Sequence, residues 1–236
     1  NQDEIETELK TIGANFETLK YEELIDKTAE FLLMEKAVGW FQGRMEFGPR
    51  ALGCRSILGD PRSDKMQKNL NLKIKYRESF RPFAPSVLRE DLSDWFEINV
   101  DSPYMLLVAN INQSKKIEMN DEQKNLFGID KLNIKRSEIP AVTHVDYSAR
   151  VQTVTKNTNN RYYDLICKFK EKTGCPVIVN TSFNVRGEPI VNTPTDAFNC
   201  FMGTELDYLV IGDCILDKLK QNPKLKKDYT KEFELD

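Results

Sequence analysis

The chain has 236 residues, a net charge of −3, a pI near 5.5 and 40% hydrophobic residues. This composition allows a packed core, in one large domain or two small ones. No apolar run approaches the ~20 residues that cross a bilayer, and the acidic N-terminus lacks the apolar segment of a signal peptide. We therefore expect a soluble, cytoplasmic protein without a membrane partner.

Cysteine and histidine usage argues against a metal site. The five cysteines are odd in number and form no C-x-x-C motif, so we expect buried, reduced thiols. The single histidine, His144, cannot build a histidine-rich metal site. A structural role is the default interpretation for His144.

Elements are predicted in chain order from apolar spacing and turn residues. Residues 1–20 are polar and weakly patterned, and we expect a linker from a preceding domain, because the chain opens on Asn rather than Met. Helices are predicted over residues 21–37, 63–72, 92–98, 159–174 and 193–204. Strands are predicted over residues 38–43, 55–58, 80–88, 103–111, 141–145, 150–155, 176–183 and 207–216, the last as one long strand or two short ones.

The remaining segments are polar. Residues 112–138 are expected to form a surface excursion, and residues 218–236 a charged tail without core residues. Helices and apolar strands alternate irregularly, which favours a layered α/β (α+β) domain over residues 21–217 with a twisted, mixed sheet flanked by helices.

Basic charge is concentrated between Arg44 and Arg89, which hold seven arginines and four lysines against four acidic residues. Prolines and glycines punctuate the same stretch, and a solvated basic surface does not need them. We interpret this stretch as a site for small anions, most simply phosphates.

The first candidate cluster is Lys75, Arg77 and Arg81. If residues 76–88 are extended, these even-spaced side chains lie on one strand face, where they repel each other unless an anion lies between them. Arginine offers a bidentate fork to phosphate and lysine a point charge. The alternative is a solvated edge strand, which the following Pro-Phe-Ala-Pro disfavours.

A second cluster follows the apolar strand at 176–183. Small polar residues at the carboxyl end of a buried strand often contact ligands, so Ser182 and Asn184 are candidates, although turn formation alone could explain them. Arg150 begins another strand, and its burial would require an anionic partner. Arg50 and Arg55 lie in a glycine-rich loop that fits neither a Walker A motif nor G-x-G-x-x-G.

Four motifs in order carry a resemblance over roughly residues 38–216: GRMEFGPRALGCRSILGDPR, KIKYRESFRPFAPSVL, VTHVDYSARVQTV and CPVIVNTSFNVRGEPIVNTPTDAF. They closely resemble the C-terminal domain of the nodulation-type and antibiotic-tailoring O-carbamoyltransferases. The resemblance implies a YrdC-like fold.

The resemblance also implies a reaction. Carbamoyl phosphate and ATP, with Mg²⁺, form carbamoyl-adenylate in this domain, and a separate N-terminal actin-like ATPase-type domain transfers the carbamoyl group to a hydroxyl. It places Lys75, Arg81, Arg150, Ser182 and Asn184 at carbamoyl phosphate. The first three of these are the catalytic candidates. Arg50 matches a nucleotide-contacting position, and Arg55 and Arg77 are weaker candidates for that role.

Other functions remain open from the sequence. One alternative is a threonylcarbamoyl-adenylate synthase, which the GPRALG and FRPFAPSV motifs disfavour. Another is an RNA-binding module that uses the basic stretch, which the acidic pI and the lack of interleaved aromatic residues disfavour. A third is that the isolated domain is inert, because the nucleotide site needs the other half.

Overall fold

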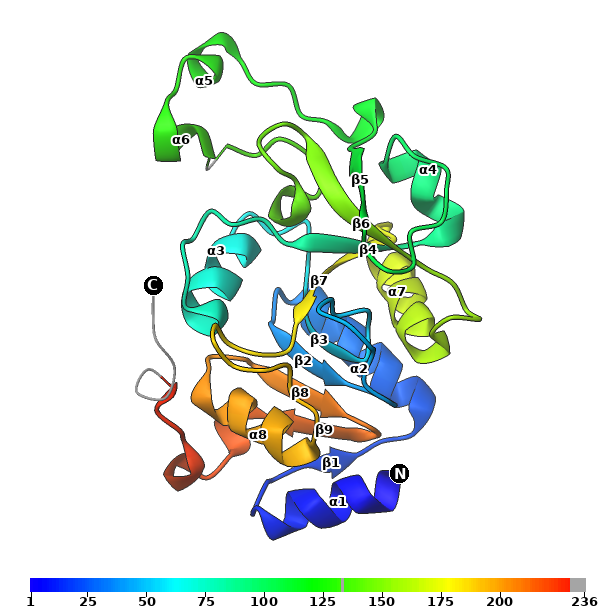
Figure 1. Ribbon diagram of the computed structural model, residues 1–236, viewed down its shortest axis with the longest axis vertical. Helices are drawn as coiled ribbons and strands as arrows, with labels where there is room; N and C mark the ends of the chain where they lie inside the picture. The colour runs from blue at the N-terminus through cyan, green and yellow to red at the C-terminus, as the bar shows by residue number, and fades with distance from the viewer. Residues whose placement is uncertain (133, 230–236) are drawn as a thin grey trace.

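The computed structural model describes residues 1–132 and 134–229, which form a nine-stranded mixed sheet flanked by helices (Figure 1). The strand order is β1-β9-β8-β2-β3-β7-β4-β6-β5, with parallel pairing of β2 with β8 and of β4 with β6 and antiparallel pairing elsewhere. The strands are β1 (Glu17–Thr18), β2 (Val38–Phe41), β3 (Arg55–Gly59), β4 (Ala84–Leu88), β5 (Leu107–Asn110), β6 (Ser148–Val154), β7 (Val177–Ser182), β8 (Tyr208–Ile211) and β9 (Cys214–Asp217).

Helices cover the sheet and fill its connections. Helices α2 and α7 pack against each other behind the sheet in Figure 1, whereas α8 lies in front of it and contacts α1. The helices are α1 (Gln2–Thr11), α2 (Tyr21–Leu33), α3 (Met66–Leu70), α4 (Leu92–Trp95), α5 (Asp121–Lys124), α6 (Gly128–Leu132), α7 (Asn160–Thr173) and α8 (Pro194–Gly203). The predicted layered α/β architecture with a mixed sheet is confirmed.

Helices α7 and α8 begin with well-formed side-chain caps. In α7, the Asn159 side chain accepts a hydrogen bond from the backbone of Tyr162, and Gly174 ends the helix at φ +75°. Helix α8 begins with a reciprocal capping box between Thr193 and Asp196. Such caps satisfy the orphan N–H and C=O groups of the helix ends.

The first twenty residues are folded in the structure, although their weak pattern predicted no regular element. Their role as a linker from a preceding domain stays a prediction. Helix α1 starts with a capping box between Asn1 and Glu4 and buries Leu9 completely. Strand β1 pairs with β9. The polar composition hid this element because only one face of α1 contacts the domain.

The predicted strand over residues 141–145 is also wrong. Residues Pro140–Val142 form a 3₁₀ turn instead, and the Ala141 backbone N–H donates to the carbonyl of Pro61. Three consecutive side chains from Ala141 to Thr143 are buried. This run cannot alternate between two faces of a sheet, so its apolar composition reflects packing in a turn.

The tail also contributes to the core, contrary to the prediction of a tail without core residues. Tyr229 is buried, and its ring packs directly on Gly203, in the space that a side chain at that position would need. Its hydroxyl donates to Glu188 Oε1 over 2.9 Å. Residues 230–236 of the predicted tail lie outside the described residues.

Candidate functional site

A polar cavity of about 170 Å³ lies at the carboxyl end of β7, the strand between β3 and β4 in the middle of the sheet. Its lining comes from the glycine-rich loop, from the segment before β4, from β6 and from β7. The lining residues are Pro49, Arg50, Ala51, Arg77, Pro82, Phe83, Ala84, Met105, Arg150, Asn180, Thr181 and Ser182. The structure thus brings together parts of all the candidate clusters.

Lys75 reaches this region by a route that the sequence did not predict. Helix α3 continues as a π-helical turn over Asn71–Lys75, and Tyr76 ends it in the left-handed region at φ +48°. Strand β4 begins only at Ala84. The prediction that Lys75, Arg77 and Arg81 share one face of a strand is therefore wrong.

Lys75 nevertheless meets the residues of the second candidate cluster. Its Nζ donates to the carbonyl and hydroxyl oxygens of Ser182, at 2.5 and 3.2 Å, and to the carbonyl and amide oxygens of Asn184, at 2.8 and 2.9 Å. Ser182 Oγ also donates to Asn184 Oδ1. The amine therefore fixes the loop that borders the cavity.

Burial changes the protonation of this amine. Desolvation lowers the pKa of Lys75 to about 7, the positive charge of Arg77 acts in the same direction, and Cys200 and Glu188 oppose it. A bound anion nearby would favour the ammonium form. The charge of Lys75 is thus available to a ligand near neutral pH.

Arg77 and Arg81 have different surroundings. Arg77 Nε donates to Asn71 Oδ1 over 2.6 Å, and its guanidinium lies 4.9 Å from the centroid of the Phe83 ring. Desolvation, followed by the charge of Arg81, lowers the pKa of Arg77 to about 10. Arg81 is half-exposed and forms an ion pair with Glu78 at 2.9 Å.

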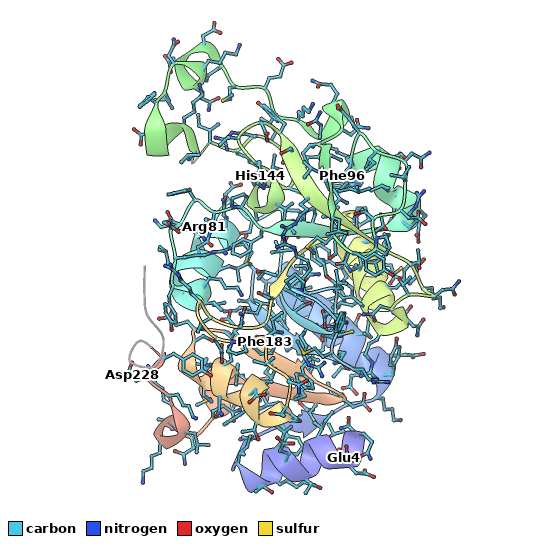
Figure 2. All side chains as sticks on the ribbon, viewed as in Figure 1. Glu4, Arg81, Phe96, His144, Phe183 and Asp228 are labelled. Carbon is cyan, nitrogen blue, oxygen red and sulfur yellow. The ribbon has the colours of Figure 1, made fainter. Side chains whose placement is uncertain are left out.

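A second cavity of about 310 Å³ adjoins the first, and Arg77, Pro82, Phe83, Ala84 and Arg150 line both. Arg81 and His144 line only this outer cavity, and Figure 2 shows them near each other above α3. Desolvation lowers the pKa of His144. Val108 and Ser148 complete the lining.

Arg150 lies between the two cavities. Its Nε is buried without a hydrogen-bond partner, and desolvation followed by the charge of Arg50 lowers its pKa. Within the described residues, neither arginine belongs to an ion pair within 4.0 Å. Arg150 is only partly buried, so the condition for which an anionic partner was predicted is met at its Nε alone, and an anion in the cavity would supply that partner.

Arg55 is not among the residues that line either cavity. Its guanidinium donates to the carbonyls of Gln42, Gly43 and Cys54 and lies 3.4 Å from the centroid of the Phe41 ring. These contacts hold the start of the glycine-rich loop. Arg50, from the same loop, does line the inner cavity.

Glu46 organises the same loop, a role that the sequence reasoning missed. One carboxylate oxygen accepts from the backbone N–H groups of Leu52, Cys54 and Arg55, at 2.5, 3.3 and 3.4 Å. Gly53 lies in this turn at φ +102°, against the ring of Tyr162. The acidic residue inside an arginine-rich motif was the available signal.

A buried network beneath the loop was missed as well. Asn180 Nδ2 donates to the carbonyl of Ala51, to Ser86 Oγ and to Gln152 Oε1, and Gln152 Nε2 donates to the carbonyl of Leu52. An asparagine inside the β-branched run PVIVN was the signal, because a buried amide needs partners.

Two further structural findings concern metal and membrane. Among residues 1–132 and 134–229, no group of three or more His, Cys, Asp or Glu side chains could hold a metal ion. The cysteines there are free; Cys175, Cys200 and Cys214 are buried, whereas Cys54 and Cys167 are only partly buried. No helix in the described part of the chain combines the length and apolar character that crossing a membrane requires.

Comparison with known proteins decides the family, because residues 29–218 match the model described as carbamoyltransferase C-terminus. The chain belongs to this family. The resemblance found in the four motifs is therefore confirmed. The relatives that the chain matches include nodulation proteins and an O-carbamoyltransferase.

The chain is 57% identical to the uncharacterized protein sll1178 of Synechocystis, over 99% of this chain and 38% of that protein. It is 40% identical to the nodulation protein NolNO of Sinorhizobium fredii, over 93% and 30%. It is 35% identical to the 3'-hydroxymethylcephem-O-carbamoyltransferase of Streptomyces clavuligerus, over 75% and 30%. The chain thus spans about a third of the length of these relatives.

Among solved structures, full-length HypF in its phosphate- and nucleotide-bound form aligns with a TM-score of 0.43 and 16% identity. The alignment covers 78% of this chain and 20% of that chain.

Proposed function

We propose that this chain is the adenylate-forming part of an ATP-dependent O-carbamoyltransferase. It binds carbamoyl phosphate and ATP and produces carbamoyl-adenylate. Transfer of the carbamoyl group to a hydroxyl acceptor requires a further domain, which we propose to be an N-terminal, actin-like ATPase-type domain. The relative that acts on a hydroxymethylcephem, by its name, supports a hydroxyl as the acceptor.

One observation carries the proposal: Arg50, Arg77 and Arg150 line a cavity of about 170 Å³, and neither Arg50 nor Arg150 forms an ion pair within the described residues. A volume of this size suits a small phosphorylated molecule rather than a polymer. Dense positive charge is also what phosphoryl chemistry requires, because catalysis depends on positioning and on stabilising developing charge.

The proposed reaction has two steps. Water hydrolyses carbamoyl phosphate to carbamate and phosphate. A carbamate oxygen then attacks the α-phosphorus of ATP, the bond from that phosphorus to the bridging oxygen breaks, and pyrophosphate leaves. In this scheme the roles predicted for Lys75, Arg81, Arg150, Ser182 and Asn184 at carbamoyl phosphate remain proposals.

The two cavities give this scheme a spatial arrangement. The inner cavity would hold carbamoyl phosphate with its phosphate at the boundary where Arg150 lies, so that Arg81 would approach this phosphate from the outer cavity. The rest of the outer cavity, which measures about 310 Å³, would hold the nucleotide. Arg77 lines both cavities and could contact either substrate. Mg²⁺ would arrive with ATP and be held by the phosphate oxygens, which suit its preference for oxygen ligands.

The test is pyrophosphate release by the 236-residue chain with ATP and either carbamoyl phosphate or threonine plus bicarbonate. Release with carbamoyl phosphate supports the proposal, whereas release only with threonine identifies the alternative synthase. Calorimetric titration with carbamoyl phosphate tests the site without the further domain. Absence of binding by the folded chain would overturn the assignment.

A further inference from the structure

One buried polar atom beside the inner cavity has no hydrogen-bond partner. Asn180 is 1% exposed, lines that cavity and has no hydrogen-bond donor for its side-chain oxygen Oδ1 within the described residues. An unpaired buried acceptor costs about 1–3 kcal/mol, so its retention calls for a reason.

The orientation of the Asn180 amide is fixed by its surroundings. Nδ2 donates to the carbonyl of Ala51 over 3.0 Å, and a carbonyl can only accept. Nδ2 also donates to Gln152 Oε1 over 2.8 Å, and Gln152 cannot turn its amide because its own Nε2 donates to the carbonyl of Leu52. The atom that remains unpaired is therefore the oxygen.

The unpaired oxygen needs a hydrogen-bond donor from the ligand. Arg50, Arg77 and Arg150 offer only donors to the cavity, so they match the acceptor oxygens of a phosphate. A phosphate group that is fully ionised has no donor to give in return. A ligand with an N–H or O–H group next to its phosphate would pair with this oxygen.

We propose that Asn180 Oδ1 accepts a hydrogen bond from the amide NH₂ of carbamoyl phosphate and so selects this ligand over acyl phosphates that lack the amide. This inference rests on the proposed function. Asn180 Oδ1 would bind the carbamoyl end of the ligand, and the arginines would bind its phosphate. A site built around a hydrogen bond to its ligand strongly rejects an analogue that lacks the group, because the buried partner is then left unpaired.

The test compares carbamoyl phosphate with acetyl phosphate, in which a methyl group replaces the amide, and with inorganic phosphate. We expect the 236-residue chain to bind carbamoyl phosphate at least ~10-fold more tightly than acetyl phosphate. In Asn180→Ala this preference should fall to within about twofold, with the affinity for acetyl phosphate retained.

Gln42→Ala is the matched control, because Gln42 is also a buried amide, bonded to the Gly212 carbonyl and to Arg161, and lines neither cavity. Gln42→Ala should keep the preference for carbamoyl phosphate over acetyl phosphate.

Equal binding of the two acyl phosphates by the unmodified chain, or a preserved preference in Asn180→Ala, overturns the inference but leaves the proposed function standing. Failure of carbamoyl phosphate and phosphate to bind at all overturns the proposed function instead. If Asn180→Ala does not fold, the comparison on the unmodified chain still decides.

Discussion

Lys75 Nζ donates to Asn184 Oδ1 over 2.9 Å, across a separation of 109 positions in the chain. This bond joins the π-helical turn after α3 to the loop after β7, and the same amine also holds Ser182. Lys75 is therefore a support of the cavity wall as well as a charge beside it.

Arg81→Ala and Lys75→Ala should both abolish measurable binding of carbamoyl phosphate, but with different effects on stability. Arg81 is half-exposed, so its loss should leave the free energy of unfolding within about 0.5 kcal/mol. Loss of Lys75 leaves oxygens of Ser182 and Asn184 unpaired and should also destabilise the fold. Calorimetry and urea unfolding measure the two quantities.

Lys73→Ala is the control for these variants, since Lys73 lies in the same basic stretch but is exposed and pairs with Glu205. It should bind carbamoyl phosphate normally. Normal binding by folded Arg81→Ala would contradict its predicted role.

The lowered pKa of Lys75 predicts a rise in stability with pH. The pKa is about 7 in the folded protein against an ordinary 10.5, so between these values the unfolded chain binds more protons. The cost of burying the charge is thus fully present below pH 7 and is relieved as pH rises. The free energy of unfolding of the ligand-free chain should increase from pH 7 to pH 8.5 relative to Lys75→Met. Parallel curves for the two proteins, measured by urea unfolding, would refute the assignment.

Gly53→Ala should destabilise the protein by about 2–4 kcal/mol. A Cβ at Gly53 would lie 2.4 Å from Tyr162 Cδ1, and the backbone there has φ +102°. Gly43→Ala is the matched control, because Gly43 also has positive φ but nothing within 4 Å of its Cβ position. Thermal unfolding of the pair separates the steric cost from the backbone cost; equal costs would contradict the packing argument.

Tyr229→Phe should weaken carbamoyl phosphate binding by about 2–5-fold and cost about 1 kcal/mol of stability. The Tyr229 hydroxyl holds Glu188, whose other carboxylate oxygen accepts from the Val185 backbone and whose carbonyl accepts from Asn184 Nδ2. Tyr21→Phe removes a tyrosine hydroxyl bond to Asp164, remote from the loop, and should leave binding unchanged. Equal affinities of both variants would show that the tail does not influence the site.

Most of the architecture could be predicted because its signals are local. The capped helix α7 and the β-branched strand β7 follow from spacing and turn residues within a short window. Helix α1 could not be found this way, because its place depends on α8 and β9, nearly two hundred positions later. The strand predicted over residues 141–145 was wrong for a related reason. An apolar run that is buried in a turn, where Ala141 bonds to the carbonyl of Pro61, has the same composition as a buried strand.

The candidate site could likewise be predicted only in part. Lys75, Ser182 and Asn184 do meet, but the expected extended geometry was wrong because no sequence rule anticipates the π-helical turn that ends at Tyr76. Arg55 could not be separated from Arg50 by residue type alone, since both are arginines in one loop. Glu46 was missed because its partners are backbone groups, which the sequence does not display. Asn180 was missed because its partners, Ala51, Ser86 and Gln152, lie far from it in the chain.

The position of β7 between β3 and β4 has a consequence for the kinetics of folding. Arg50, Arg77, Arg150 and Ser182 become neighbours only after strands far apart in the chain have paired, and such non-local pairing is slow. Affinity for phosphate should therefore return only in the last phase of refolding. A ligand that binds this cavity would recognise the native state alone, and it would slow unfolding rather than speed folding.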